Sequence, residues 1–332
     1  MIGERIGQYT VKAKLGDGGM GAVYLGEHAV MRKRAAIKVL LPQWTQNETI
    51  VRWFTNEAIA MGALDHPNIV TVSDCGQLAN GCWYIVMEYL DGGTLGRFCA
   101  SLGGPVSVHD TLHVLAQVAA GLEAAHRIGI VHRDLKPENI FLVQRGLNPR
   151  FAKILDWGIS KLGEQHGRSA TRTGMIAGTP SYMAPEQMKD LRTVDKRTDV
   201  FAMGVIAYQM VTGGWLPFQR MEQPDEFANL SLVSMYEVVM RGEPVDPRKH
   251  VPSIDPEVAS AIFAAIHPDP ARRPQTPRAF ILLLAGAVRG DGFNASGTVI
   301  VKEVAPELLE IGNLGETVRG VKPISSRASS RY

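Results

Sequence analysis

The stretch HRDLKPENIF, residues 132–141, brings an acid, a lysine and an amide together within a few positions. Asp134 can accept a proton from a hydroxyl nucleophile, and Lys136 can neutralise charge on a phosphoryl group in transfer. Asn139 offers a neutral oxygen of the kind that Mg²⁺ accepts as a ligand. A buried, salt-bridged turn would explain the same charges, so the neighbouring segments have to decide between the two interpretations.

A second acidic residue closes the apolar run KILD, residues 153–156. An aspartate at the end of a strand is usually a turn former. In the catalytic interpretation Asp156 instead joins Asn139 as a hard oxygen ligand of a metal ion that also binds phosphate oxygens.

Glycines follow the GxGxxG spacing at Gly16, Gly18 and Gly21, between two segments that we predict as strands. Glycine lets the backbone come close to phosphate oxygens and donate N–H groups to them. A glycine-rich hairpin without a ligand explains the spacing equally well. The context disfavours a dinucleotide-binding fold, in which such a turn leads from a strand into a helix.

Lys38 lies within the apolar stretch AAIKV, residues 35–39. A lysine in the middle of a strand is usually an edge residue whose charged end reaches water. A buried ammonium group requires an anion instead, and Glu57, on the helix predicted to follow, is a candidate partner. Such a pair would be able to hold the phosphates of a nucleotide.

Hydrophobic periodicity divides the chain into two unlike parts. The first ninety residues predict a small β-sheet that carries one helix, and a mainly helical region follows DGG at 91–93. Asn80-Gly81 favours the positive φ angles of a tight hairpin between two β-rich runs. The other predicted strands are 8–15, 22–30 and 35–41, and the predicted helices are 48–64, 106–129, 199–213, 231–240, 256–266 and 278–288.

The composition excludes several classes of protein. The formal net charge of +2 over 332 residues argues against nucleic acid as a partner, and the three cysteines lack the spacing of a zinc site or a disulfide framework. The first ten residues do not resemble a signal peptide, and the apolar run FILLLAGAV, residues 280–288, is too short to cross a bilayer. We therefore expect a soluble, cytoplasmic protein without a transmembrane segment.

The last part of the chain differs from the rest. From about Asp291 it becomes rich in glycine, serine and arginine, which predicts a partly disordered tail. Within it, GTVIVKEVAPELLEI, residues 297–311, keeps enough apolar residues to dock on another surface.

Five motifs together resemble the eukaryotic-type protein kinases, and specifically the serine/threonine kinases of this type found in bacteria. They are GDGGMGAV, AAIKV, HRDLKPEN, DWG and GTPSYMAPE, in this order, and the similarity runs from about Gln8 to about Val288. The resemblance implies an α+β, bilobal protein-kinase fold. A small antiparallel sheet with one main helix would form the N-lobe over 1–90, a larger helical C-lobe would cover 91–290, and the tail would cover 291–332.

The resemblance also implies a role for each motif in phosphoryl transfer from ATP. Asp134 would be the catalytic base, and Lys136 would lie near the γ-phosphate. Lys38, paired with Glu57, would hold the α- and β-phosphates. The residues expected around the nucleotide are Leu15, Gly16, Gly18, Gly21, Val23, Ala36, Lys38, Met87, Glu88, Leu90, Phe141, Asn139 and Asp156, with Asn139 and Asp156 as the ligands of Mg²⁺ or, as a second candidate, Mn²⁺.

GTPSYMAPE, residues 178–186, resembles the end of an activation segment that faces a protein substrate. Thr179 would contact the catalytic base and the lysine of the catalytic loop. Glu186 would pair with Arg273, and Asp199 would anchor the catalytic loop.

Arg133 directly precedes the expected base, and in this family such an arginine often binds a phosphate on the activation segment. Thr171 and Thr173 are therefore the predicted autophosphorylation sites, with Ser169 as the second choice. Ordinary loop hydroxyls are the alternative. HRDLKPEN together with GTPSYMAPE favours serine and threonine over tyrosine as acceptors.

Two features depart from the family pattern. Trp157 stands where the family usually has phenylalanine, and we expect it to pack near Met61 and His132. The segments QRGLNPR, residues 144–150, and QRMEQPDEFANL, residues 219–230, look like a lengthened and an inserted surface loop.

These observations predict a serine/threonine protein kinase that uses ATP and Mg²⁺, phosphorylates proteins and its own activation segment, and forms transient dimers. A pseudokinase that binds nucleotide and partners without efficient catalysis is the alternative, but every ligand and base position is filled. A kinase of small molecules is a third interpretation, which the complete GTPSYMAPE segment disfavours.

Overall fold

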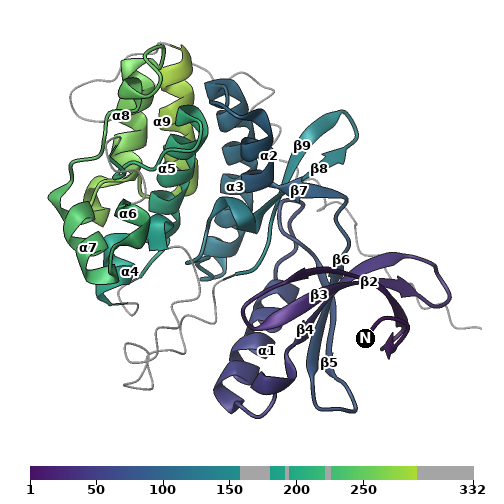
Figure 1. Ribbon diagram of the computed structural model, residues 1–332. Helices are drawn as coiled ribbons and strands as arrows, with labels where there is room; N and C mark the ends of the chain where they lie inside the picture. The colour runs from purple at the N-terminus through teal and green to yellow at the C-terminus, as the bar shows by residue number, and fades with distance from the viewer. Residues whose placement is uncertain (158–179, 191–193, 221–225, 290–332) are drawn as a thin grey trace, which may run out of the picture.

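The computed structural model describes residues 1–157, 180–190, 194–220 and 226–289, which form two lobes (Figure 1). The N-lobe is a six-stranded sheet in the order β1-β2-β3-β4-β6-β5, in which neighbouring strands are antiparallel. One helix, α1 (Glu48–Gly62), packs beside this sheet. The strands are β1 (Arg5–Ile6), β2 (Tyr9–Asp17), β3 (Gly21–His28), β4 (Arg34–Leu40), β5 (Val72–Gln77) and β6 (Trp83–Glu88).

The helix α1 begins at Asn47, whose side chain accepts hydrogen bonds from two backbone N–H groups of the first turn. Ile50 and Phe54 lie on the buried face of the helix and pack against Ile85 of the sheet. The predicted helix over 48–64 is therefore confirmed, and its apolar spacing is what turns one face toward the sheet.

The hairpin between β5 and β6 confirms the predicted turn with one difference. Only Gly81 has a positive φ, at +85°. Asn80 instead accepts a hydrogen bond from the backbone N–H of Cys82 at 3.1 Å through its side chain. The other predicted strands correspond to β2, β3 and β4, with small shifts at their ends.

The C-lobe is mainly helical, and the helix α5 forms its centre. Almost every residue of α5 is buried, because the other helices surround it. The five helices predicted after residue 93 correspond to α3, α5, α7, α8 and α9. The helices are α2 (Leu95–Leu102), α3 (Val108–Arg127), α4 (Pro185–Lys189), α5 (Arg197–Thr212), α6 (Glu226–Asn229), α7 (Leu232–Arg241), α8 (Pro256–Ala265) and α9 (Pro277–Arg289).

A second, three-stranded sheet lies beside α2 and α3 and corrects one prediction (Figure 1). It consists of β7 (Gly92–Thr94), β8 (Ile140–Arg145) and β9 (Asn148–Ile154). The predicted lengthened loop at 144–150 is wrong, because these residues continue both strands around a two-residue turn at Gly146 and Leu147. The polar residues beside the turn concealed the pairing, since only the start of β8 and the end of β9 are buried.

The second predicted insertion, 219–230, lies partly outside the described residues. Its end forms the short helix α6, whose Phe227 is buried beside Phe218. That end therefore contributes to the core of the C-lobe.

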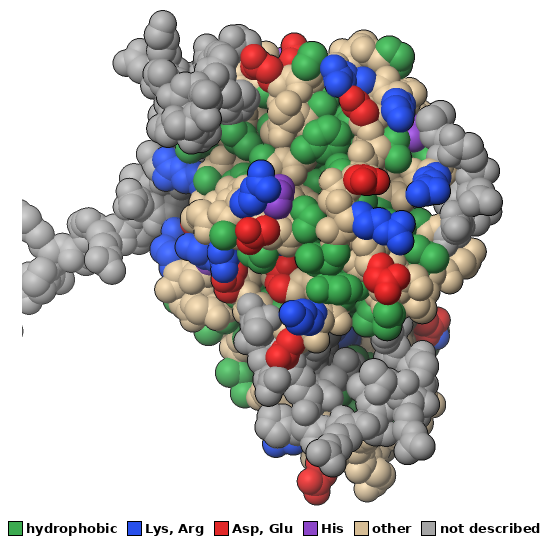
Figure 2. Space-filling model, turned by 90° about the vertical axis from the view of Figure 1, so that its left-hand side faces the viewer, with side chains coloured by type: hydrophobic (Ala, Val, Ile, Leu, Met, Phe, Trp, Pro, Cys, Tyr) green, Lys and Arg blue, Asp and Glu red, His purple; other side chains and the backbone are tan. Residues whose placement is uncertain are grey.

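The face of the molecule shown in Figure 2 carries blue and red side chains interspersed among apolar ones. Among the described side chains of this face, no large area of one sign is visible. It therefore offers no single-signed surface that would attract a polyanion. Within the described part of the chain, no helix is both long enough and apolar enough to cross a membrane.

Candidate active site

The register of the N-lobe sheet places the expected nucleotide residues on one face. Val23 pairs with both Gly16 and Lys38, and Ala36 pairs with Met87. Directly paired residues on antiparallel strands point to the same side, and residues two apart along a strand do as well. The five side-chain positions therefore share the face that also meets α1.

Gly21 allows the glycine-rich turn to lie close to β4. A Cβ atom at this position would come within 2.7 Å of the backbone oxygen of Val39. A larger residue would therefore push the turn away from the strand that carries Lys38. The backbone N–H of Gly18 donates to the carbonyl of Gly21 at 2.7 Å, which closes the turn.

Lys38 joins the two lobes through its ammonium group. Its Nζ atom lies 3.0 Å from Glu57 Oε1 and 3.0 Å from Asp156 Oδ1, so the predicted pair with Glu57 is confirmed and a second carboxylate is added. Burial opposes the charge of Lys38, but the two carboxylates together raise its pKa. Two carboxylates thus share one ammonium group.

The two carboxylates differ in their environments. Glu57 is buried, and burial raises its pKa despite the attraction of Lys38. The charge of Lys38 lowers the pKa of Asp156, whose side chain is half exposed. Asp156 is therefore the ionised carboxylate that remains open to a further cation.

The expected catalytic loop brings its three chemical groups together. Lys136 Nζ lies 3.0 Å from Asp134 Oδ2. The amide nitrogen of Asn139 donates to the backbone carbonyl of Asp134 at 2.8 Å, which turns the amide oxygen of Asn139 in the other direction. The predicted grouping of Asp134, Lys136 and Asn139 is therefore present in the structure.

Asn139 and Asp156 come together because adjacent strands carry them. Asn139 directly precedes β8, Asp156 follows β9, and the backbone N–H of Leu155 donates to the carbonyl of Asn139 at 2.8 Å. An amide oxygen and a half-exposed carboxylate suit Mg²⁺, which usually takes one or two protein ligands together with phosphate oxygens and water. Within the described residues, no cluster of three or more His, Cys, Asp or Glu side chains that would hold a metal ion is found. The donor set therefore fits a metal ion that is shared with a bound phosphate.

The carboxylate of Asp199 anchors the expected catalytic loop. Its two carboxylate oxygens accept hydrogen bonds from the backbone N–H groups of His132 (2.9 Å) and Arg133 (3.0 Å), and His126 Nε2 donates to it at 2.7 Å. Arg133 has a φ of +64°, a strained conformation that lets consecutive N–H groups reach one carboxylate. Burial opposes ionisation of Asp199, but these donors hold its pKa below the usual range. The predicted anchor is confirmed.

Trp157 lies in the core, next to the catalytic loop. Its ring centroid is 4.8 Å from that of His132, as predicted, and Trp157 and Met61 both belong to the large buried cluster of the C-lobe. Burial lowers the pKa of His132, whose Nε2 donates to the backbone carbonyl of Leu155 at 3.0 Å. The indole N–H of Trp157 has no hydrogen-bond partner among the described residues.

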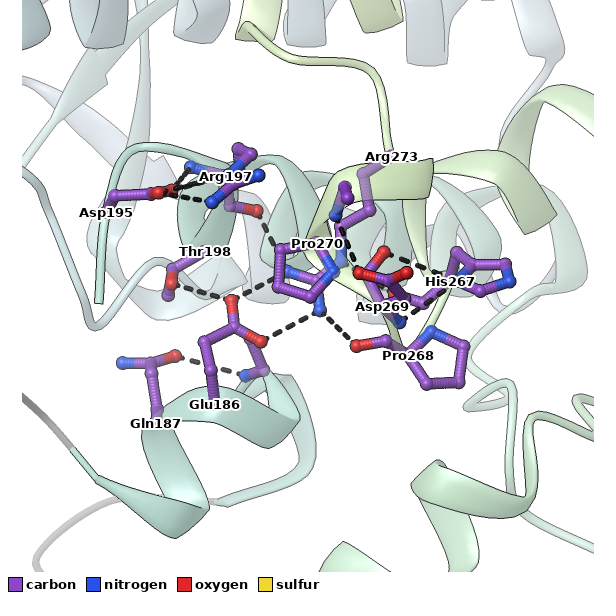
Figure 3. A network of polar contacts seen from close by, with 12 residues as sticks. Glu186, Gln187, Asp195, Arg197, Thr198, His267, Pro268, Asp269, Pro270 and Arg273 are labelled. Carbon is purple, nitrogen blue, oxygen red and sulfur yellow. Dashed lines mark hydrogen bonds and ion pairs between the residues drawn. The ribbon is translucent and has the colours of Figure 1, made fainter. Parts of the chain in front are cut away.

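Glu186 and Arg273 form a buried, two-bonded ion pair in the C-lobe, as predicted (Figure 3). The guanidinium group of Arg273 donates to both oxygens of Glu186, at 2.7 and 2.8 Å. Thr198 also donates to Glu186 at 2.9 Å, and backbone carbonyls, including those of His267 and Pro268, accept from Arg273. This network joins the expected end of the activation segment, at Glu186, to the body of the C-lobe.

Lys153 is a candidate site residue that sequence reasoning missed. Its buried ammonium group lies 2.5 Å from Glu88 Oε1 and 3.2 Å from the carbonyl of Ile69. Glu88 also accepts from the backbone N–H of Thr71 at 2.8 Å. The contacts position Glu88, at the expected adenine edge, relative to β9. The available signal was a lysine within an apolar strand, the same signal that singled out Lys38.

Three of the expected site residues, Thr171, Thr173 and Thr179, lie outside the described residues, as does the second-choice acceptor Ser169. Arg133, expected to bind a phosphate on the same segment, is described. Its Nε and Nη1 atoms are buried without a partner in the described part of the chain, and burial lowers its pKa. The carboxylate of Asp199 favours the charge of Arg133, but these two nitrogens donate to no described acceptor.

The comparisons with known proteins agree with this geometry. A family profile described as "Protein kinase domain" matches residues 9–281. Serine/threonine-protein kinase Pkn1 of Myxococcus xanthus is 41% identical over 289 residues, and pkn3 of the same organism is 37% identical over 277. The alignments cover 87% and 82% of this chain, but only 39% and 48% of the relatives.

A solved structure extends the likeness to three dimensions. The chain resembles the crystal structure of the Mycobacterium tuberculosis PknI kinase domain with a TM-score of 0.65 and 26% sequence identity. The match covers 86% of this chain and 99% of that domain. The chain therefore shares the bilobal fold of that kinase domain.

Proposed function

Because the chain belongs to the protein kinase family, we propose that it transfers the γ-phosphoryl group of ATP, in the presence of Mg²⁺, to serine and threonine hydroxyls of proteins. The contact of Lys38 with both Glu57 and Asp156, at 3.0 Å each, is the observation that carries this proposal. It joins the expected phosphate-binding lysine to an expected metal ligand across the boundary of the lobes. The pseudokinase alternative is not favoured, because the groups expected for catalysis are present.

The nucleotide would bind along the sheet face described above. Val23, Ala36 and Phe141 are all half-buried and would contact the adenine ring. The backbones of Glu88 and Leu90 would face its polar edge. Leu15, Gly16, Gly18, Gly21 and Met87 would complete the surroundings of the nucleotide.

Phosphoryl transfer places few covalent demands on the protein, so these residues would act mainly by position and charge. The acceptor hydroxyl would give its proton to Asp134 while its oxygen bonds to the γ-phosphorus and the bond to the bridging oxygen of ADP breaks. Lys136 would neutralise charge on the transferring group. Mg²⁺ held by Asn139 and Asp156 would supply further neutralisation at the β- and γ-phosphates.

The proposal includes autophosphorylation of Thr171 and Thr173. Arg133 supports it, because two buried guanidinium nitrogens without a described partner suit a phosphate as a charged acceptor. Phosphopeptide mapping of an active preparation tests this part. Empty sites at both threonines would remove it.

Transfer of labelled γ-phosphate from Mg·ATP to a generic protein acceptor tests the main proposal. The wild type should label the acceptor, Asp134→Asn should lose about 10² to 10⁴-fold in rate, and Asp65→Asn, at an exposed aspartate outside the site, should not change the rate. Nucleotide binding without transfer in the wild type would establish the pseudokinase alternative. Label on a small-molecule acceptor alone would establish the third interpretation.

A further inference from the structure

The hairpin of β8 and β9 forms an open apolar groove with α3 and α9, with a volume of about 760 Å³. Its apolar walls are Leu112, Leu147, Pro149, Ala285 and Val288. Leu147, at the tip of the hairpin, is fully exposed, at 103% of its reference area. An apolar groove edged by an exposed leucine is typical of a surface that binds something, and its volume suits several aliphatic side chains.

The groove is separate from the candidate active site. None of its lining residues is among those expected to bind nucleotide, metal or acceptor. It lies at the start of β9, Asn148–Arg150, whereas Asp156 follows the end of the same strand. A ligand in the groove would therefore not occupy the catalytic position.

We propose that residues 297–311 of the same chain bind in this groove. Val288 lines the groove and α9 ends at the next residue, so the chain leaves the described structure at the groove edge. Val299 lies eleven positions after Val288, and at about 3.3 Å per position the connecting chain reaches roughly 35 Å. The segment is therefore close enough to bind without strain. Its aliphatic residues are Val299, Ile300, Val301, Val304, Leu308, Leu309 and Ile311.

The charges of the groove do not oppose this occupant. The rim of the groove carries two histidines, His109 and His113, and the ion pair of Arg150 with Asp110. The segment 297–311 carries three glutamates and one lysine. The one carboxylate of the rim is paired, so the rim presents no unpaired carboxylate to the acidic segment.

The covalent link between α9 and residues 297–311 favours binding within one chain over binding to a second copy. A short flexible linker gives an effective concentration on the order of millimolar, well above that of a free protein at micromolar concentration. Even a weak apolar contact is then populated within one chain. The bound segment would contact the β8–β9 hairpin at the end opposite to Asn139 and Asp156.

Hydrogen–deuterium exchange on the full chain tests the proposal without using catalysis, so its outcome is independent of the proposed function. Amides of 297–311 should exchange about tenfold more slowly than in Leu147→Asp or Leu308→Asp. Because both variants break one contact, the double variant should exchange no faster than either single one. The control Val233→Asp alters an exposed valine on α7 and should not change the exchange.

Three results would overturn the proposal. Unprotected exchange of 297–311 in the wild type would mean that the segment does not dock. Protection that survives Leu147→Asp would place it on a different surface. Protection that disappears on dilution, with a matching change in sedimentation, would assign the groove to a second copy of the chain.

Discussion

Two ion-pair centres of the molecule differ in how completely their charges are satisfied. In the C-lobe, Arg273 is buried and meets one carboxylate, Glu186, with two hydrogen bonds, and neighbouring groups take up the remaining donors and acceptors (Figure 3). Between the lobes, Lys38 meets two carboxylates, Glu57 and the half-exposed Asp156. The first centre is complete, whereas the second keeps an excess of negative charge.

The difference separates an architectural ion pair from a candidate site. A buried pair with every group bonded gains nothing from a ligand, but losing one partner leaves a costly uncompensated charge. A centre with excess negative charge and an exposed oxygen can still bind a cation. Substitutions at the two centres should therefore affect different quantities.

The largest expected effect is the loss of Arg273. Arg273→Met leaves Glu186 buried without its counter-ion, so the free energy of unfolding should fall by about 3–5 kcal/mol. Equilibrium denaturation with urea measures it. Arg197→Gln is the control, because Arg197 and its partner Asp195 are partly exposed, and it should cost less than about 1 kcal/mol. Equal losses in the two variants would contradict the distinction.

The second effect concerns activity rather than stability. Lys38→Met should lower kcat/KM by about 10² to 10³-fold, since the expected phosphate-binding charge is gone. Stability should change by less than about 1 kcal/mol, because burial already raises the pKa of Glu57 and the carboxyl can become neutral. Kinetics and denaturation on the same preparations give both quantities. The exposed Lys33→Met serves as the control, and a parallel collapse of stability in Lys38→Met would make this centre architectural too.

The pH dependence of Asp199 gives a third, smaller effect. Its donors lower its folded pKa, so the ionised carboxylate stabilises the folded state fully above the unfolded value of about 3.9. This stabilisation is lost as the pH falls toward the lowered folded pKa. Asp199→Asn should therefore be less stable by about 1–3 kcal/mol near neutral pH, and the difference should narrow below about pH 4. Denaturation curves of the wild type and Asp199→Asn, measured from neutral pH down to below about pH 4, test this prediction. A stability difference that does not change with pH would contradict an ionised anchor.

The smallest effect is expected beside Asp156, for the substitution Trp157→Phe. Trp157→Phe removes a buried N–H without a described partner and also some packing, so stability should change by less than about 1.5 kcal/mol. Trp157→Ala, which leaves a cavity, should cost about 3–5 kcal/mol. Thermal or urea unfolding compares the two. A large loss in the phenylalanine variant would show that the indole N–H does have a partner.

Much of the fold followed from local patterns. The helix over 48–64 and the strands around the glycines were predictable because their apolar residues recur at the period of each element. The hairpin at 144–150 was not, because exposed polar residues at strand ends resemble a loop. Hydrophobic periodicity predicts a strand only where positions of the strand are buried, and the positions beside this turn are not.

By itself the sequence determined which chemical groups are available and where short motifs place them, since Asp134, Lys136 and Asn139 lie within one loop. Only the tertiary structure decided which charges meet. Lys38 reaches Asp156 across 118 positions of the chain, and Lys153 reaches Glu88 across 65. Such contacts depend on how strands and helices pack. The charge balance that distinguishes a functional site therefore arises only in the packed structure.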